Sequence, residues 1–285
     1  MTHKVFPARP IPLLILTALF LNGMPALGLA QSKAQTQAEA AAKPATKAET
    51  ARPASAADRE LADRLPPLER ASFWAREVNI DPMNAEPHLR LAYALRGVGQ
   101  FEQAAESAQK ALMLDPKRVD AMLEVGRNHI ARGQAFYGIT ALELAVETAP
   151  KDWRAHSLLG VAYEAVERPE EAMARWQMAL TVSPDNPAVL TNMAMLLATQ
   201  GGLPEAEGLL RKATTRPGST LQMRLNLALV LGLQGKMQEA EQILRRDQPP
   251  ETVAVNLRWL REQLPENAPS GDNGRTWNTL NKAAG

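Results

Sequence analysis

Small and apolar residues recur at a constant spacing through the middle of the chain. Four prolines, each closing a short apolar stretch, follow one another at intervals of 34 residues: Pro82, Pro116, Pro150 and Pro184. With Ala85 counted as position 1, five units of this length begin at Ala85, Val119, Trp153, Pro187 and Leu221. Position 7 is apolar in all five units, and positions 8 and 20 hold only alanine or glycine. Such a period is typical of a solenoid of stacked helical repeats.

The pattern within each unit predicts two antiparallel helices joined by a short turn. Apolar residues three and four positions apart give each helix one apolar stripe, and the small residues at positions 8 and 20 allow the two helices to approach closely. Position 15 is glycine in four of the five units, where it ends the first helix. No unit can bury its apolar face alone, so the units must stack. The predicted fold class is therefore all-α, a solenoid of about five helix-turn-helix units.

The repeat resembles the tetratricopeptide repeat, and the resemblance covers roughly residues 59–264. Residues 59–84 are interpreted as a degenerate half repeat, and residues 85–264 as the array itself. Asp247 stands at position 27 of the fifth unit, where the other units have alanine, and two prolines then end the array at residues 249–250. Residues 251–264 are predicted to form a capping helix that covers the last unit with Val253, Leu257, Leu260 and Leu264.

The first 58 residues predict export and a linker. Lys4 and Arg9 precede a short apolar stretch over residues 13–21, and small residues lead up to an expected cleavage site before Gln31, so residues 1–30 are interpreted as a signal peptide. A retained membrane anchor is the alternative, although the apolar run is short for a hydrocarbon layer of roughly 30 Å. Residues 31–58 contain no large apolar side chain, which predicts a disordered linker.

Charge and cysteine content narrow the functional classes. The chain has a formal net charge of +1, and loss of Lys4 and Arg9 with residues 1–30 would make it −1. A nearly neutral chain has no electrostatic basis for binding nucleic acid. The absence of cysteine excludes disulfides, thiolate metal sites and lipidation of an exported N-terminus. We therefore expect a periplasmic protein that is not a lipoprotein.

No combination of residues predicts a catalytic site. His88 and His156 fall at position 4 and His129 at position 11, which are packing positions of the first helix, so core or groove-edge histidines are expected. The chain has no HExxH or GxSxG motif, and the glycine that a phosphate loop before Lys236 would need is replaced by Val230. We expect no enzymatic activity, no cofactor, no metal and no small-molecule substrate.

A partner-binding groove is the functional candidate that remains. The family resemblance implies that first-helix positions 2, 5, 6, 9, 12 and 13 line a concave face. Asn192 and Asn226 share position 6 of adjacent units, where their amides can pair with the backbone of an extended peptide. Arg127, at position 9, can meet a carboxylate. Arg90 and Tyr93 complete the predicted polar residues.

Apolar side chains are also predicted in this groove: Leu89, Leu123, Val161, Met195, Leu225 and Leu229. Two alternatives remain open, because several of these side chains can simply pack in the core, or the chain's own tail can fill the groove. The residues with which chaperone-binding members of the family grip a C-terminal carboxylate have no counterparts at the matching positions.

The C-terminal third resembles a narrower group, the TadD-type assembly protein of tight-adherence (Flp) pili. The resemblance rests on an NLALxLxLxG unit from Asn226, an RxDxPP break, an NLxxLR helix from Asn256, and a WxxL motif in the tail. It implies an envelope accessory factor that supports the pilus secretin or other pilus components. A scaffold for another export or polysaccharide system and a regulatory subunit of an envelope enzyme remain alternatives.

The tail itself, residues 265–285, is polar and rich in Pro, Gly and Asn, yet it contains Trp277 and Leu280. One helical turn would place these two side chains on one side. We expect residues 273–280 to be a docking segment that binds either the chain's own C-terminal units or a partner.

Overall fold

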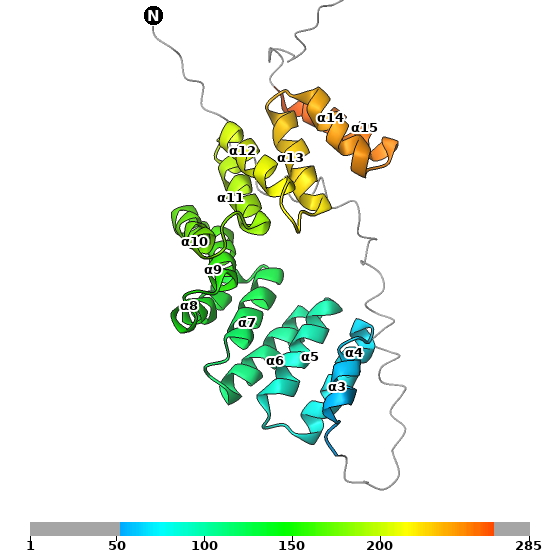
Figure 1. Cartoon of the computed structure of the whole chain (residues 1–285), viewed down its shortest axis with the longest axis vertical. Coiled ribbons are helices and arrows are strands. Elements are labelled where there is room, and N and C mark those ends of the chain that lie inside the picture. The colour runs from blue at the N-terminus through cyan, green and yellow to red at the C-terminus, as the bar shows by residue number, and fades with distance from the viewer. Residues whose placement is uncertain (1–51, 265–285) are drawn as a thin grey trace, which may run out of the picture. The chain divides into compact units, whose positions relative to one another are not determined.

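The computed structural model describes residues 52–264, which form helices and no strand. These residues divide into two compact bodies, residues 52–184 (the N-terminal body) and residues 185–264 (the C-terminal body). Figure 1 shows both bodies as successions of antiparallel helices. The predicted all-α repeat architecture is confirmed.

The N-terminal body contains a helical lead-in and three repeat units. The lead-in consists of α3 (Ala56–Ala62) and α4 (Pro67–Ile80). The units pair α5 (Ala85–Gly97) with α6 (Phe101–Leu114), α7 (Val119–Ala131) with η1 (Ala135–Gly138) and α8 (Ile139–Thr148), and α9 (Trp153–Ala165) with α10 (Pro169–Val182). Each helix from α4 to α10 packs against the next along the chain, as expected when units bury their apolar stripes by stacking.

The C-terminal body contains two units and a final helix. The units pair α11 (Pro187–Thr199) with α12 (Leu203–Thr214) and α13 (Leu221–Leu233) with α14 (Met237–Asp247), and α15 (Pro250–Gln263) follows. A first helix begins at each of the five positions that the period predicts. Prolines at the first or second position of α11, α12 and α15 suit these helix starts, because a first-turn N–H has no acceptor within the helix.

Position 8 is small because position 24 of the same unit packs onto it. A Cβ atom on Gly160 would lie 2.4 Å from the Trp176 indole nitrogen, and one on Gly126 would lie 2.4 Å from Leu142. Trp176 is buried, and its Nε1–H donates to the carbonyl oxygen of Ser157 at 3.1 Å. The glycine therefore makes room for a large side chain from the second helix.

Position 15 ends each first helix in the left-handed backbone region. The φ angle is 69° at Gly133 and 60° at Glu167, which is the one unit without glycine at this position. Glu167 thus adopts the conformation that glycine supplies elsewhere, at the steric cost of a Cβ atom.

The two histidines at position 4 tie α5 and α9 to the turn that precedes each of these helices. His88 Nε2 lies 3.0 Å from the carbonyl oxygen of Pro82, and His156 Nε2 lies 3.0 Å from that of Pro150. Both side chains are buried. These are packing histidines, and the recurring proline supplies the hydrogen-bond acceptor.

Helical structure begins before the predicted linker boundary at Asp58. Ser55 caps α3 in a capping box with Asp58, and the Ala54 N–H donates to the Glu77 carboxylate at 3.0 Å. Glu77 is 1% exposed and also pairs with Arg59 at 3.0 Å. Placing the linker's end at Asp58 was therefore wrong by several residues, because a buried carboxylate on α4 holds the incoming chain.

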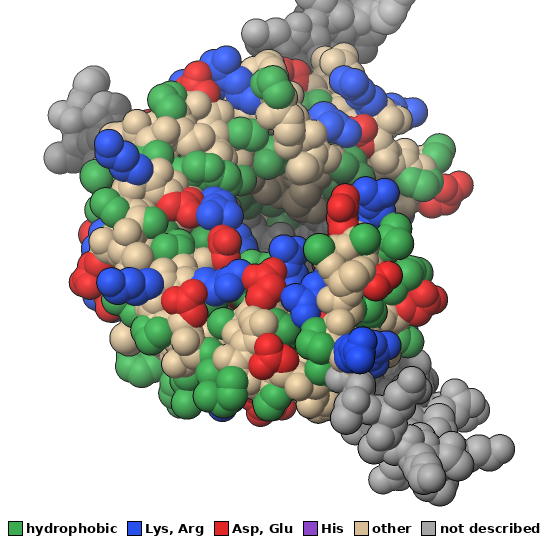
Figure 2. Space-filling model, turned by 60° about the horizontal axis from the view of Figure 1, so that its bottom comes forward, with side chains coloured by type: hydrophobic (Ala, Val, Ile, Leu, Met, Phe, Trp, Pro, Cys, Tyr) green, Lys and Arg blue, Asp and Glu red, His purple; other side chains and the backbone are tan. Residues whose placement is uncertain are grey.

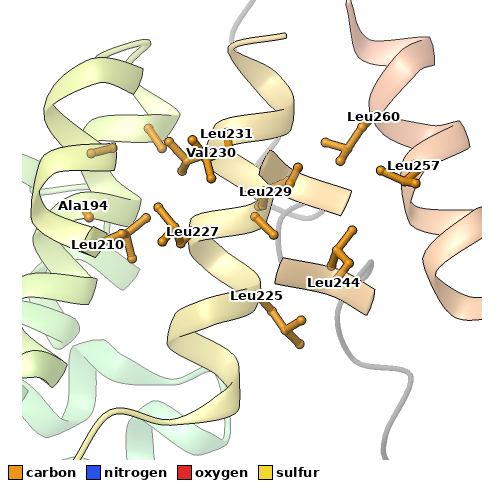
Figure 3. Packing of buried hydrophobic residues seen from close by; sticks show 14 of the residues in the cluster. Ala194, Leu210, Leu225, Leu227, Leu229, Val230, Leu231, Leu244, Leu257 and Leu260 are labelled. Atoms are coloured by element: carbon orange, nitrogen blue, oxygen red, sulfur yellow. The ribbon is translucent and has the colours of Figure 1, made fainter. Parts of the chain in front are cut away.

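One continuous apolar cluster fills the C-terminal body. Figure 3 shows Leu225, Leu227 and Leu229 on α13 among side chains of the neighbouring helices, with Leu257 and Leu260 pointing inward from α15. A Cβ atom on Gly232 would lie 2.4 Å from Leu260, so α15 packs closely on α13. This helix covers the last unit as a cap, and it begins at Pro250, one residue before the predicted start.

No helix within residues 52–264 has the length and apolar character needed to cross a membrane.

Candidate functional site

The candidate site is the set of first-helix positions 2, 5, 6, 9, 12 and 13, here called the first-helix face. In the N-terminal body, carboxylates and arginines at these positions pair with each other. Arg90 on α5 donates to Glu86 at 2.6 Å and to Asp63 at 2.8 Å, and Arg118 donates to the same Glu86 carboxylate. Burial alone would raise the pKa of Glu86, but the hydrogen bond from Arg90 and the charge of Arg118 lower it below its usual value. Arg90 is therefore held by the chain's own acids.

Glu124, at position 6 of α7, is the centre of a second cluster. Its side chain is fully buried and accepts from Arg96 at 2.5 Å and from Arg127 at 3.4 Å. Asn128 donates to the Glu124 carboxylate at 3.2 Å. The predicted ability of Arg127 to meet a carboxylate is thus used within the chain, and a partner's carboxylate would compete with Glu124. A buried carboxylate with two arginine partners positions α5 against α7.

Tyr93 lies between these two clusters. Its ring packs on Leu89, Ala111 and Ala121. Burial, followed by the negative charges of Asp120 and Glu124, raises the pKa of the Tyr93 hydroxyl to about 12. The structure therefore brings Arg90, Tyr93 and Arg127 together, as neighbours on α5 and α7.

Most of the apolar residues assigned to the groove lie in the core instead. Leu89, Leu123, Leu225 and Leu229 are at most 3% exposed. They pack between helices, which is the alternative that the sequence left open for them, and they do not line a partner surface. Val161 and Met195 remain half-buried and belong to the first-helix face.

The C-terminal body presents amides on its first-helix face. Asn192 on α11 and Asn226 on α13 are both half-buried, and these two helices contact each other. The Asn226 Oδ1 atom accepts from Gln222 Nε2 at 3.0 Å, which leaves the Asn226 amide hydrogens for another acceptor. Within residues 52–264 the Asn192 side chain makes no hydrogen bond. Two amides whose N–H donors are unused within residues 52–264 therefore recur one repeat apart.

The two bodies differ in the charge of this face. Positions 2 and 6 hold Glu86, Arg90, Asp120 and Glu124 in the first two units, whereas the last two units have Ala188, Asn192, Gln222 and Asn226 there. Asp120 meets Arg154 of the next unit at 3.3 Å, so the ion pairs link successive first helices. Figure 2 shows acidic and basic side chains interspersed over the face in view. Asn192, Gln222 and Asn226 make this part of the first-helix face neutral, and it is here called the amide face. Such a surface suits the main chain of an extended segment, which offers N–H and C=O groups in alternation.

The ion pairs that link neighbouring helices of the N-terminal body were not predicted from the sequence. Asp63, Glu86 and Arg118 take part in them. Charged residues of both signs at positions 2 and 6 of the first three units, Glu86, Arg90, Asp120, Glu124 and Arg154, were a visible signal for them. Among residues 52–264, no group of three or more His, Asp or Glu side chains is arranged to hold a metal ion. Trp277 and Leu280 lie outside the described residues.

Comparisons with known proteins agree with this architecture. Tetratricopeptide repeat family models match residues 85–118 and 191–251. The structure of PilF from Pseudomonas aeruginosa is similar with a TM-score of 0.59 and 18% identity, over 73% of this chain and 96% of that one. A thermophilic tetratricopeptide repeat protein from Thermus thermophilus gives 0.55 and 20%, over 62% and 99% of the two chains.

MamA from Desulfovibrio magneticus RS-1 is similar with a TM-score of 0.50 and 23% identity, over 55% of this chain and 90% of that one. No curated protein sequence matches the chain. At these identities the likeness establishes the fold, and function has to be argued from the site.

Proposed function

We propose that this tetratricopeptide repeat chain is a non-enzymatic scaffold of the cell envelope and an accessory factor in tight-adherence (Flp) pilus assembly. Tetratricopeptide repeats act as protein-interaction scaffolds, and the family matches and the repeat architecture support that general role. The chain would be periplasmic after cleavage before Gln31. Its partner would be the pilus secretin or another assembly component.

The observation that carries the binding proposal is the recurrence of Asn192 and Asn226 at position 6. An extended segment has a repeat of about 3.3 Å per residue, and an asparagine amide can donate to and accept from its main chain at once. The half-buried setting of both amides makes them accessible without leaving them fully hydrated. They would hold the main chain, while Met195 contacts a partner side chain.

Support for the pilus role comes from the C-terminal third. The NLAL stretch lies in α13, the double proline begins α15 after α14 has ended, and the NLxxLR stretch lies in α15. Three of the four features that carry the resemblance thus lie in one packed body, the C-terminal body. The amide pair lies in this same body.

A complementation experiment in a strain with a tight-adherence pilus tests the proposal. Cells lacking this chain would receive the wild type, the Asn192→Ala/Asn226→Ala variant, or a control variant. The control, Gln177→Ala/Gln242→Ala, removes two exposed amides from the second helices α10 and α14. We expect the asparagine variant to lose assembled secretin and surface pili, and the control to restore both.

Equal complementation by the two variants would reject the amide site, and normal pili in cells lacking the chain would reject the pilus role. Sequencing the N-terminus of the purified protein tests its location. Gln31 is expected as the first residue, and an intact Met1 in the inner-membrane fraction would contradict a soluble periplasmic form.

A further inference from the structure

The final helix α15 repeats the pattern of a first helix but has arginine at two places where α13 has apolar residues. Residues 226–231 of α13 read NLALVL, and residues 256–261 of α15 read NLRWLR. Ala228 and Leu231 of α13 are fully buried. Arg258 and Arg261 stand at the corresponding places in α15, and both are exposed.

In every other unit a second helix packs against the first helix: α6 on α5, α8 on α7, α10 on α9, α12 on α11 and α14 on α13. Within residues 52–264, α15 has no such helix after it. Its partners there are α13 and α14. The side of α15 that carries Arg258 and Arg261 is therefore the side on which a second helix would lie.

A surface pocket of about 310 Å³ lies between α14 and α15 at this place, here called the α14–α15 pocket. Val253, Ala254 and Leu257 provide its apolar lining, and Val253 and Leu257 also belong to the core cluster. Arg245, Arg258 and Arg261 provide its basic lining. The pocket thus combines an apolar floor with a basic rim.

Within residues 52–264, acidic side chains leave two arginines of this rim without an ion pair. Glu241 also lines the pocket, but it pairs with Arg245 at 2.5 Å. Arg258 and Arg261 make no ion pair within residues 52–264. Two guanidinium groups beside an apolar floor favour a ligand that has an apolar stripe flanked by carboxylates.

We propose that the α14–α15 pocket binds an acidic amphipathic helix of a partner protein, which packs where a second helix would follow α15. The apolar stripe of that helix packs on the exposed Ala254 and on the small parts of Val253 and Leu257 that reach the pocket surface. Its flanking Glu or Asp side chains pair with Arg258 and Arg261. This surface consists of other residues than the amide pair, so its occupation does not depend on the proposed function.

Charge favours such a partner over the chain's own tail. Residues 265–285 contain Glu266 and Asp272 against Arg275 and Lys282, which sum to zero. The tail therefore offers no net negative charge to these two arginines. A second copy of the chain is the other occupant that the test has to distinguish.

The test uses the chain from Gln31 to Gly285 and two synthetic helical peptides of about 20 residues. Both peptides have leucines at the i, i+3, i+4 and i+7 spacing of an amphipathic helix, and one carries Glu and the other Lys at the flanking positions. Fluorescence anisotropy is expected to show binding of the acidic peptide alone, and this binding should weaken as salt is raised. The Arg258→Glu/Arg261→Glu variant should bind it roughly tenfold more weakly.

Arg246→Glu is the matched control, because Arg246 is exposed on α14 outside the pocket. This variant should keep wild-type affinity, and circular dichroism should show that both variants fold. Equal binding of the two peptides, or equal loss in the control, would overturn the proposal. So would a large gain in affinity after removal of residues 265–285, which would identify the tail as the occupant, or a dimer that the double reversal dissociates.

Discussion

Arg224 and Asp247 form a bidentate pair across the fifth unit, with nitrogen–oxygen distances of 2.6 and 2.9 Å. Both residues depart from the repeat. Arg224 stands at position 4, where the other units have His, Met or Leu, and Asp247 stands at position 27, where they have alanine. The hydrogen bond from Arg224 lowers the pKa of the Asp247 carboxyl. The two departures from the repeat pattern therefore compensate each other, because the arginine and the aspartate form an ion pair.

The pair predicts a coupling that a double-mutant cycle measures. Asp247→Ala leaves Arg224 without its acceptor and should cost about 1 kcal/mol of unfolding free energy. Adding Arg224→Leu restores residue types found at these positions in other units, so the second substitution should cost less in the Asp247→Ala background than alone. Urea denaturation of the four proteins gives the coupling energy. Additive effects would show that the two side chains do not interact.

Two Gly→Ala substitutions in helices should have opposite effects on stability, because one glycine is closely packed at position 8 and the other faces open space. Gly160→Ala places a methyl group against Trp176, and overpacking of this kind typically costs about 1–3 kcal/mol. A Cβ atom on Gly208 in α12 would meet open space, so alanine there should add about 0.5–1 kcal/mol through helix propensity. Thermal unfolding should lower the Tm of the first variant and raise that of the second. Equal shifts would contradict the packing argument.

The environment of His129 predicts acid sensitivity near neutral pH. Burial, followed by the positive charge of Arg132, lowers the pKa of His129 in the folded state. As pH falls below the unfolded value of about 6.5, the unfolded chain binds a proton that the folded chain resists. The unfolding free energy should therefore decrease between about pH 7 and pH 5. His129→Gln should make this part of the stability curve flatter, and an unchanged slope would rule out His129 as its source.

Tyr93 predicts a separate change at alkaline pH. Its pKa of about 12 lies above the unfolded value of about 10. The unfolded chain then loses its proton first, so stability should fall as pH rises from about 10 towards 12. A Tyr93→Phe variant should lack this component, which difference denaturation curves in that range would reveal. Identical curves for the two proteins would mean that the hydroxyl ionises freely in the folded state.

The helical frame was predictable from sequence because it depends on local composition repeated five times. The period placed the start of each first helix at the residue where the structure begins it, from Ala85 to Leu221. The linker boundary failed at α3, although Ser55 and Asp58 formed a visible capping-box pattern. The polar composition of residues 31–58 is typical of a disordered linker, and it hides the short capping-box pattern at the end of this segment.

The site was less predictable, because a repeat position specifies the face of the helix on which a side chain lies and does not specify how deeply that side chain is buried. Leu89 and Leu229 occupy positions that line the groove in such arrays, yet here they are closed over by neighbouring helices. Glu124 is buried by contacts with Arg96, which lies 28 residues away, and no local pattern reports such a contact. The amides of Asn192 and Asn226 were found because a repeated polar residue at one position stands out from the apolar background.

The most direct test of the central claim, that the amide face holds a pilus component, is site-specific photo-crosslinking in pilus-producing cells. A benzophenone amino acid would replace Asn192 or Asn226, and Gln177 or Gln242 as controls. The account predicts a covalent adduct with a tight-adherence assembly component from positions 192 and 226 and none from positions 177 and 242. Absence of any adduct at the asparagine positions, or equal adducts at the control positions, would contradict it.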